Sequence, residues 1–447
     1  MQVVGKDVFE TSSPVVSWGV VRLVLVLVVA LGLVSVQVDY ANAFVQAELS
    51  EVQYMRCPRG LPVSGAVLKL QKSLYGLKDS PLNWFRKLSN ALRDHGFKAA
   101  DYEPCLFIKK DILVVVYVDD CIFVAKDDKI ITREIDRLKS EFDLDREDDM
   151  AGFLGVSIAT KEDGTKELTQ TGLIDRILDA LSLQNSNGKA TPAENGTIGS
   201  CKESPALQST WNYRAVVGMM LYLASNSRSD IAFAVNQCAR FSSNPREPHG
   251  IALKRIGRYL NGTKRRGMVI KPAKTLHLDL YVDADFAGLW NQEDVEDPIC
   301  VRSRTGFVVT LGGVPVIWKS KLQTEVALST FESEYIACST AMREFLPLRN
   351  VLKEVCTTME LPWNDESRSS TVWEDNNACL SLLLAPLPKI SPRAKHIAVK
   401  YHWVRQYFQQ SWLTAKKIKS SEQLADIYTK GLPEATFIHL RKLIMGW

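Results

Sequence analysis

Two adjacent aspartates interrupt an apolar, β-branched stretch, and this feature constrains the fold more than any other. Residues 112–125 read ILVVVYVDDCIFVA, so two β-branched runs flank Asp119 and Asp120. The pattern predicts a β-hairpin with both carboxylates at its tip. Neighbouring carboxylates between apolar flanks repel each other and lose hydration, which is costly unless a cation neutralises them. Taken alone, however, the dipeptide favours an ordinary Asp-Asp turn on a surface hairpin.

The apolar stretch before Asp39 fits either a membrane segment or a buried helix followed by a strand. Residues Leu23–Val36 carry no charge, but Arg22 precedes them and leaves about fourteen residues where a membrane span needs about twenty. The alternative is a buried helix over about Ser17–Leu31 and a strand over Val34–Val38. That strand would place Asp39 at its end, where it could join the paired aspartates in binding metal. A signal peptide is disfavoured because the apolar run starts late.

The C-terminal third predicts an α/β order with acids at strand ends and helix starts. The expected elements are three strands, a helix, a strand and a helix: Leu276–Val282, Gly306–Leu311, Val314–Trp318, about Ser329–Glu354, Val372–Asp375 and the segment from Asn376. Four acids stand out: Asp283 after the first strand, Glu334 early in the long helix, Asp375 as the last residue of the fourth strand, and Asp426 at the start of a last helix. Each alone is more typical of a surface or helix-start charge, but this order can focus all four at one edge.

The middle of the chain predicts a loop followed by packed helices. Residues 182–207 are rich in Ser, Asn, Gly and Pro, which is typical of a loop or linker. Apolar residues then recur at helical spacing from about Tyr213 to Thr263. No catalytic set is evident there, but the basic run from Lys254 to Lys274 could grip a nucleic-acid backbone.

Charge and cysteine content narrow the class of protein. The net charge of +4 is modest, but residues 251–274 hold eight Lys or Arg and no acid, and residues 389–447 hold eleven against three acids. Basic stretches near acidic pockets suit a polyanion handled by a metal enzyme, although solvated helix faces explain either stretch alone. The nine cysteines form no C-x-x-C pair. This argues against a disulfide framework or a zinc site and favours a reducing, intracellular setting.

Several motifs, in order, resemble the Pol polyproteins of copia-type long-terminal-repeat retrotransposons. Three blocks are similar to the family's polymerase motifs: Asp39–Phe44 (DYANAF), Leu74–Lys78 (LYGLK) and Tyr117–Asp120 (YVDD). Four further blocks are similar to its nuclease motifs: Tyr281–Gly288 (YVDADFAG), Ser329–Ala337 (STFESEYIA), Glu374–Asn376 (EDN) and Ala425–Lys430 (ADIYTK). The resemblance covers nearly the whole chain.

The resemblance implies a mixed α/β and α+β fold class in three parts. Residues 1–185 would form a reverse transcriptase with a right-hand palm and thumb, residues 186–275 a linker and helical connection, and residues 276–447 a ribonuclease H-like domain. The fingers are expected to be truncated, because the chain begins just before the first motif. The basic residues that hold the incoming triphosphate in this family would then be missing.

The resemblance also implies two metal sites with two divalent ions each. Mg²⁺ is expected, because carboxylate and phosphate oxygens suit it, with Mn²⁺ as the alternative. The polymerase ligands would be Asp39, Asp119 and Asp120, and the nuclease ligands Asp283, Glu334, Asp375 and Asp426. Three side chains would contact substrate: Phe44 as the floor of the sugar pocket, Tyr117 beneath the primer end, and Lys78. Tyr117 is equally well explained as a core residue, and the roles of His396 and His402 stay open.

The implied function is an RNA-directed DNA polymerase fused to a nuclease that cuts RNA in RNA–DNA hybrids by two-metal-ion catalysis. Its partners would be an RNA template, a DNA primer, the hybrid and dNTPs, inside the cell and away from membranes. Two other hypotheses stay open. One is a catalytically incompetent retrotransposon remnant that folds or binds nucleic acid, and the other is a membrane-anchored metal-binding protein. The sequence does not specify the oligomeric state.

Overall fold

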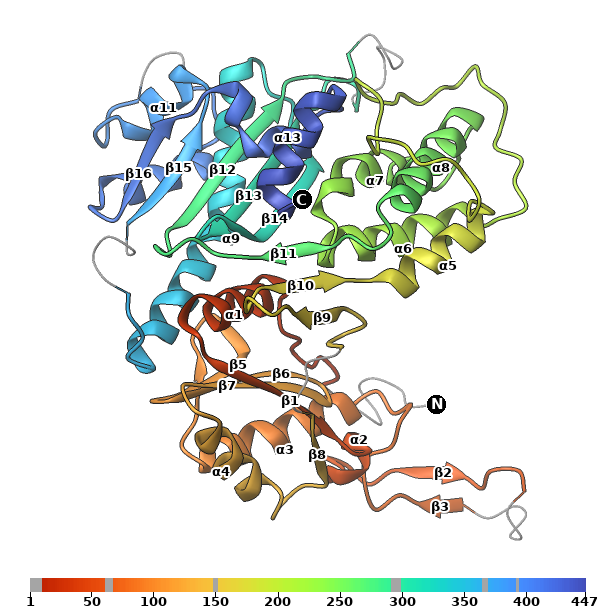
Figure 1. Cartoon of the computed structure of the whole chain (residues 1–447), viewed down its shortest axis with the longest axis vertical. Coiled ribbons are helices and arrows are strands. Elements are labelled where there is room, and N and C mark those ends of the chain that lie inside the picture. Colours follow the sequence, from red (N-terminus) through yellow and green to blue (C-terminus); the bar gives the residue numbers. More distant parts are fainter. Residues whose placement is uncertain (1–9, 61–66, 148–151, 291–298, 364–368, 391–393) are drawn as a thin grey trace. The chain divides into compact units, whose positions relative to one another are not determined.

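The computed structural model describes residues 10–60, 67–147, 152–290, 299–363, 369–390 and 394–447 (Figure 1). The chain divides into two compact units. The first unit contains residues 1–154 and 350–362, and the second contains residues 155–349 and 363–447. The predicted domain boundaries after residues 185 and 275 stay predictions, because this division reflects packing and not activity.

The first unit is built on a six-stranded antiparallel sheet. In spatial order its strands are β4 (Lys98–Ala100), β5 (Glu103–Lys109), β6 (Ile112–Tyr117), β7 (Asp120–Ala125), β1 (Val34–Tyr40) and β8 (Leu144–Glu147). Strand β1 comes first in the chain but lies between β7 and β8 in the sheet, so residues about 80 to 110 positions apart become cross-strand neighbours. This interleaving places the DYANAF and YVDD motifs side by side.

Two amphipathic helices cover one face of that sheet. Helix α3 (Ser80–Asp94) buries Trp84, Leu88 and Leu92, and helix α4 (Asp128–Leu138) buries Ile131, Ile135 and Leu138. These residues recur every three or four positions, which gives each helix one apolar stripe. They share a core with inward residues of β1, β6 and β7, which include Val38, Val116 and Phe123. Asp39 alternates with Val38 along β1 and therefore lies on the opposite face.

The apolar N-terminal stretch folds as a buried helix and a strand, as one of the two interpretations predicted. Helix α1 (Trp18–Leu31) is capped by Ser17, whose hydroxyl accepts from Val20 N, and Gly32 ends it in the left-handed conformation. Strand β1 begins two residues later and runs to Tyr40, so Asp39 lies within the strand and not after its end. Among the described residues, no helix is both long and apolar enough to cross a bilayer.

Smaller elements complete the first unit. They are α2 (Ala43–Gln46), directly after the Asp39 strand, and a two-stranded antiparallel ribbon of β2 (Tyr54–Arg56) and β3 (Val67–Lys69). Helix α2 contacts α3, which fixes the segment that follows Asp39.

The second unit begins with a small sheet and a group of helices. The sheet is antiparallel, in the order β11 (Met268–Ile270), β10 (Lys166–Thr169) and β9 (Ser157–Thr160). The helices are α5 (Thr171–Leu181), α6 (Tyr213–Asn226), the short 3-10 helix η1 (Ser229–Ile231), α7 (Ala232–Ala239) and α8 (Glu247–Gly262). The structure confirms the predicted loop, because residues 182–212 contain no helix or strand, and it confirms the packed helices that follow.

The rest of the second unit is a five-stranded mixed sheet with helices. The strand order is β14 (Val314–Leu322), β13 (Arg304–Leu311), β12 (Leu278–Asp285), β15 (Ser370–Glu374) and β16 (Leu413–Lys417). The first three strands pair antiparallel, and β12, β15 and β16 pair parallel. The helical elements are α9 (Thr330–Thr358), α11 (Asn377–Leu384), α12 (Val399–His402), η3 (Trp403–Gln409), η4 (Ser420–Glu422), η5 (Leu424–Tyr428) and α13 (Glu434–Met445). Helix α9 belongs to this unit up to Arg349, and its residues from Asn350 onward belong to the first unit.

The predicted order of three strands, a helix, a strand and a helix is confirmed, with two corrections. The prediction that Asp426 begins the last helix is wrong, because Asp426 lies in the short 3-10 helix η5 and α13 begins at Glu434. Strand β16 was not predicted. Its sequence LTAKK ends in two lysines, and this hides the apolar alternation that marks an amphipathic strand.

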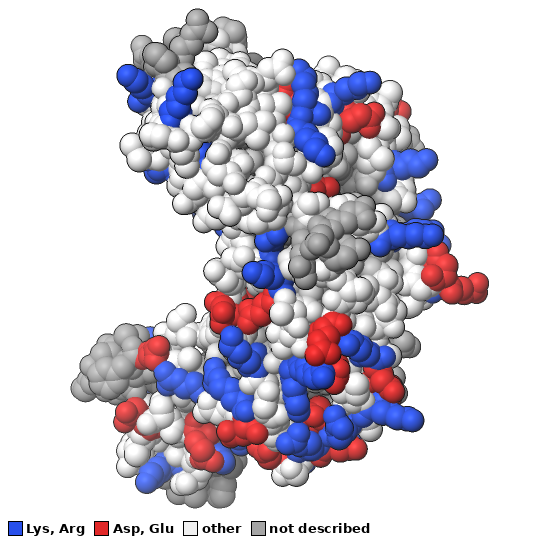
Figure 2. Space-filling model, turned by 90° about the vertical axis from the view of Figure 1, so that its left-hand side faces the viewer, with Lys and Arg blue, Asp and Glu red and all other residues white. Residues whose placement is uncertain are grey.

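The surface of the molecule carries charges of both signs on the face shown in Figure 2. On the face shown in Figure 2, Lys and Arg side chains are interspersed with Asp and Glu, in keeping with the net charge of +4. All nine cysteines are free thiols.

Candidate active sites

The β6–β7 hairpin presents the first acidic cluster. Tyr117 pairs with Asp120, so Val118 and Asp119 form a two-residue turn and Asp120 is already the first residue of β7. Val118 has a φ of 53°, a conformation that costs a β-branched residue energy. Trp84 of the LYGLK region holds this turn, because its indole Nε1 donates to Val118 O at 2.5 Å. A residue that follows the LYGLK motif in the chain, Trp84, therefore supports the turn of the YVDD motif.

Strand register aligns three carboxylates across the sheet. Asp39 on β1 lies opposite Asp120 on β7, and on its other side it lies opposite Asp145 on β8. Direct cross-strand partners share a face, so the three form a row. Asp39 and Asp120 were predicted, whereas Asp145 was not, because only the register of β8 reveals it.

Burial and like charges disfavour ionisation along this row. Burial raises the pKa of Asp120 to about 6, and the charges of Asp119 and Asp39 add to the effect. Gln37 opposes it by donating its Nε2–H to Asp120 Oδ1 at 3.2 Å. The pKa of Asp39 is also raised, mainly by burial and then by Asp119, Glu147 and Asp145. A bound cation would relieve this repulsion.

The predicted substrate contacts lie in different environments. Phe44 packs against Tyr75 with a ring-centroid separation of 4.6 Å, and Tyr117 meets Phe153 edge-on at 6.4 Å. The charges of Asp119 and Asp39 help to raise the pKa of Tyr75, after burial, so the Phe44–Tyr75 pair lies beside the acidic row. Tyr75 was not predicted to be a functional residue, although it stands inside the LYGLK motif. Lys78 is exposed in the turn before α3.

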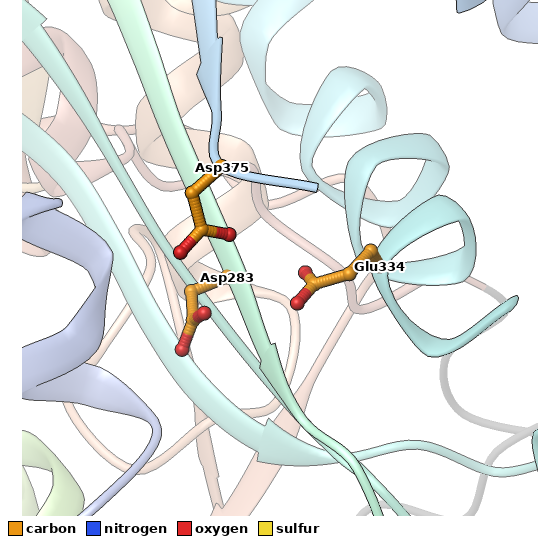
Figure 3. A group of neighbouring side chains, drawn as sticks. All are labelled: Asp283, Glu334 and Asp375. Carbon is orange, nitrogen blue, oxygen red and sulfur yellow. The ribbon is translucent and has the colours of Figure 1, made fainter. Parts of the chain in front are cut away.

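A second, tighter acidic cluster lies in the second unit. Asp283 on β12, Glu334 on α9 and Asp375 after β15 each offer a carboxylate oxygen, and these oxygens lie within 4.8 Å of one another. Figure 3 shows the three side chains pointing toward a common point from a strand, a helix and a strand end. Strands β12 and β15 are parallel, with Tyr281 opposite Trp373, so the acids two residues further along reach the same edge.

The three carboxylates of Asp283, Glu334 and Asp375 are suited to binding a divalent cation. Glu334 is 3% exposed, and its Oε2 is buried without a hydrogen-bond partner among the described residues. Burial raises the pKa of Glu334 well above its usual range, and the charges of Glu374, Asp283 and Asp375 raise it further. Hard oxygen donors that converge in this way are the ligands that Mg²⁺ and related ions take. Among the described residues, Asp39, Asp119 and Asp120 do not form such a compact group.

The fourth predicted acid, Asp426, lies beside the trio and not within it. Burial raises its pKa to about 7, with the charge of Asp283 as the next cause. Lys430 Nζ lies 2.9 Å from Asp426 Oδ1 and 3.7 Å from Asp283 Oδ2. The Thr429 hydroxyl donates to the same Asp283 Oδ2. Lys430 and Thr429 were not predicted to act here, although both stand in the ADIYTK motif.

Glu374 is a further acid that sequence reasoning missed. It is fully buried at the end of β15, and burial raises its pKa to about 8. Its Oε1 accepts from Asn376 N at 3.0 Å. Its signal was the alternation of β15, in which Ser370, Val372 and Glu374 share the buried face.

His396 and His402, whose roles the sequence does not specify, each contact one side chain of helix α9. His396 Nε2 lies 3.1 Å from Glu332 Oε2, and His402 Nδ1 lies 3.1 Å from the Tyr335 hydroxyl. Burial and Arg405 lower the pKa of His402. These contacts fit a packing role, and the alternative of a role in proton transfer stays untested.

The chain is similar to known reverse transcriptases and retrotransposon Pol polyproteins over most of its length. Residues 1–195 match the family described as reverse transcriptase (RNA-dependent DNA polymerase). The chain is 32% identical to the retrovirus-related Pol polyprotein from transposon TNT 1-94 of Nicotiana tabacum, over 98% of this chain and 33% of that protein. It is also 32% identical to the Pol polyprotein from transposon RE1 of Arabidopsis thaliana, over 97% of this chain and 29% of that protein. The chain thus spans about a third of the length of these curated relatives.

Among solved structures, a foamy viral protease-reverse transcriptase in complex with an RNA/DNA hybrid is similar over 86% of this chain and 44% of that chain. Its sequence identity is 14% and its TM-score is 0.46. A likeness of this size supports no conclusion about the site, which rests on the side-chain geometry.

Proposed function

Because the chain belongs to the copia-type retrotransposon Pol polyproteins, we propose that it is the reverse-transcriptase and ribonuclease H portion of such a polyprotein. Its first unit would be the palm of an RNA-directed DNA polymerase, and the mixed sheet of its second unit a ribonuclease H-like domain. The observation that carries the nuclease half is the convergence of Asp283, Glu334 and Asp375. The element order around them, three antiparallel strands and then a parallel fourth, supports the same assignment.

In the nuclease, the acids would hold Mg²⁺ against the RNA strand of a hybrid. The bound ions would supply an activated water and would stabilise charge on the leaving oxygen. Asp283, Glu334 and Asp375 orient their oxygens toward one point from three separate elements, so they need little rearrangement to bind. The burial of Asp283 and Glu334 keeps water away from that side of the site, which strengthens the charge interactions within it. Selection of RNA over DNA would depend on contacts with the 2′ hydroxyl.

In the polymerase, Asp39, Asp119 and Asp120 would hold the metals that serve a primer 3′ hydroxyl and an incoming dNTP. Trp84 and Gln37 would keep the two hairpin acids in place, through Val118 O and Asp120 Oδ1. The aromatic pair beside the acidic row supports the proposal that Phe44 forms the floor of a sugar pocket. The template would be RNA and the primer DNA.

A second candidate is a remnant that folds and binds nucleic acid without polymerising. One observation favours it for the first unit. Asp145 stands in register with Asp39, and Glu147 on the same strand adds a further negative charge near the row. Extra acids repel the triphosphate of a dNTP unless metals neutralise them.

The test uses the full chain with Mg²⁺ on two substrates, a labelled RNA–DNA hybrid and a primed RNA template. We expect Asp283→Asn to abolish RNA cleavage and to spare primer extension, and Asp119→Asn to do the reverse. Asp279→Asn changes another acid on β12, and Asp111→Asn changes an acid in the turn before β6, so these serve as matched controls. Cleavage that persists in Asp283→Asn would refute the nuclease assignment. Cleavage without extension in the wild type would favour the remnant hypothesis for the first unit alone.

A further inference from the structure

A lysine ammonium already lies between two of the acids that are expected to hold metal. Lys430 Nζ contacts Asp426 Oδ1 at 2.9 Å and lies 3.7 Å from Asp283 Oδ2. The Lys430 side chain is 40% exposed, while both carboxylates are buried. The ammonium is therefore held at the mouth of the site by acids that lie deeper.

This contact divides the four acids into two groups that share Asp283. On one side, Asp283 converges with Glu334 and Asp375 within the span of a single cation. On the other side, Asp283 and Asp426 both face Lys430, and within the described part of the chain neither forms an ion pair with another basic side chain. If Asp283 served two ions, one together with Glu334 and Asp375 and one together with Asp426, the second ion would compete with the Lys430 ammonium.

We propose that the Lys430 ammonium stands in for the second divalent ion, so that the resting nuclease site binds one ion tightly and a second only after Lys430 moves away. The inference rests on the proposed nuclease site and adds to it a reason why the two ions should bind unequally. A single positive charge balances part of the repulsion between Asp283 and Asp426 when no second ion is present. The same charge repels an incoming cation a few ångströms away.

The lysine side chain is suited to such an exchange. Its stem is long and flexible, its ammonium is strongly hydrated, and its partial exposure gives it a route into solvent. A nucleic-acid phosphate at the mouth of the site would offer the ammonium another partner. We therefore expect the second ion to bind more tightly when a hybrid is present than when it is absent.

The experiment counts bound Mn²⁺ by electron paramagnetic resonance in the full chain without nucleic acid. Every protein in it, including the reference called wild type, carries Asp39→Asn and Asp119→Asn, so that the proposed polymerase acids do not add to the count. The wild type is expected to bind one ion tightly and a second at least about tenfold more weakly. Lys430→Met should tighten the second ion by about tenfold or more, and Lys430→Gln should behave in the same way. Lys430→Arg keeps the charge and should retain the unequal binding of the wild type. Lys442→Met, on the exposed side of α13, removes a lysine from the same part of the chain and should change nothing.

Two results would overturn the proposal. One is a Lys430→Gln or Lys430→Met protein that folds, as judged by circular dichroism, and binds Mn²⁺ like the wild type. The other is a wild type that binds two ions with equal affinity, a result that needs no change at Lys430. Failure of the proposed function would look different. In that case the hybrid stays uncut by every protein, while the Mn²⁺ counts still differ between wild type and Lys430→Met.

Discussion

The two acidic clusters hold their carboxylates in different ways. In the first unit, Asp120 and Asp39 are cross-strand neighbours on one face of an antiparallel sheet, where side chains repeat at about 5 Å. This geometry spreads the charges along a line and leaves each carboxylate partly exposed to solvent. In the second unit, Asp283, Glu334 and Asp375 reach one point from a strand, a helix and a strand end, and the first two are almost fully buried.

The difference teaches that acids identified by similar motifs need not depend on a cation to the same degree. A partly exposed acid can be hydrated, so a row of such acids tolerates some repulsion. Buried carboxylates that converge cannot all ionise without a partner. The cluster of Asp283, Glu334 and Asp375 should therefore be the stronger cation site, and the following predictions test that ranking.

The largest expected effect is stabilisation by a divalent ion. At a Mg²⁺ concentration about 100-fold above its Kd, binding adds about 2.7 kcal/mol to the free energy of unfolding. For a unit of this size that raises the Tm by roughly 5 °C over the value in EDTA. Glu334→Gln should remove most of this increase, and Asp39→Asn should leave most of it. Scanning calorimetry of the three proteins measures it, and a full loss in Asp39→Asn would reverse the ranking of the two clusters.

A smaller effect is the pH dependence of the metal-free protein. The pKa is raised to about 6 for Asp120 and to about 7 for Asp426, so the folded state favours their protonated forms. Between about pH 4 and those values the folded protein binds more protons than the unfolded chain, and its stability falls as the pH rises. Asp426→Asn should flatten the fall up to about pH 7, and Asp120→Asn should flatten only the part up to about pH 6. Urea midpoints in EDTA from pH 4.5 to 8 provide the measurement. A larger change in Asp120→Asn would contradict the comparison.

Much of this geometry could be predicted, because it is local in the sequence. The alternation on both sides of Asp119 predicts the hairpin, and the apolar run from Ser17 followed by a glycine predicts α1. The order of strands around Asp283 and Asp375 follows from short apolar segments that end in acids. In each case the signal lies within about fifteen residues, where side-chain periodicity determines the structure.

The features of the two sites that the sequence did not predict depend on pairing between segments that are distant in the chain. Asp145 joins the row only because β8 pairs with β1 in one register, and a shift by one residue would turn it to the other face. Lys430 reaches Asp283 across 147 positions of sequence, because η5 packs against β12. No local pattern distinguishes these residues from ordinary surface charges, although the motif resemblance pointed to the ADIYTK segment.

Each cluster also has one side chain that anchors the backbone directly before an aspartate. Trp84 donates to Val118 O before Asp119, and Gln423 Nε2 donates to Val282 O at 2.8 Å before Asp283. Trp84→Phe and Gln423→Met should each cost about 1–3 kcal/mol, since a partly buried carbonyl at Val118 and a buried one at Val282 lose their donors. Urea unfolding in EDTA measures the cost. Trp84→Phe should reduce primer extension alone and Gln423→Met should reduce RNA cleavage alone. If either variant impaired both activities, the clusters would not be independent.

The smallest expected effect concerns Gln37, which donates a hydrogen bond to Asp120. Among the described residues, Glu334 Oε2 in the other cluster accepts no hydrogen bond. Gln37 Nε2 donates to Asp120 Oδ1 and lowers the pKa of that acid, while Gln37 Oε1 is buried without a hydrogen-bond partner among the described residues. Gln37→Met removes the favourable donor and the unsatisfied acceptor together, so the stability should change by less than about 1 kcal/mol. The pKa of Asp120 should nevertheless rise above about 6, and the pKa of Asp426 should stay at about 7. Carboxyl NMR titration, with Asp120→Asn and Asp426→Asn to assign the signals, follows both acids in one sample. A pKa of Asp120 that did not move would mean that burial and the neighbouring charges alone determine its ionisation. The row of acids in the first unit would then resemble the buried cluster around Glu334 more than its geometry suggests.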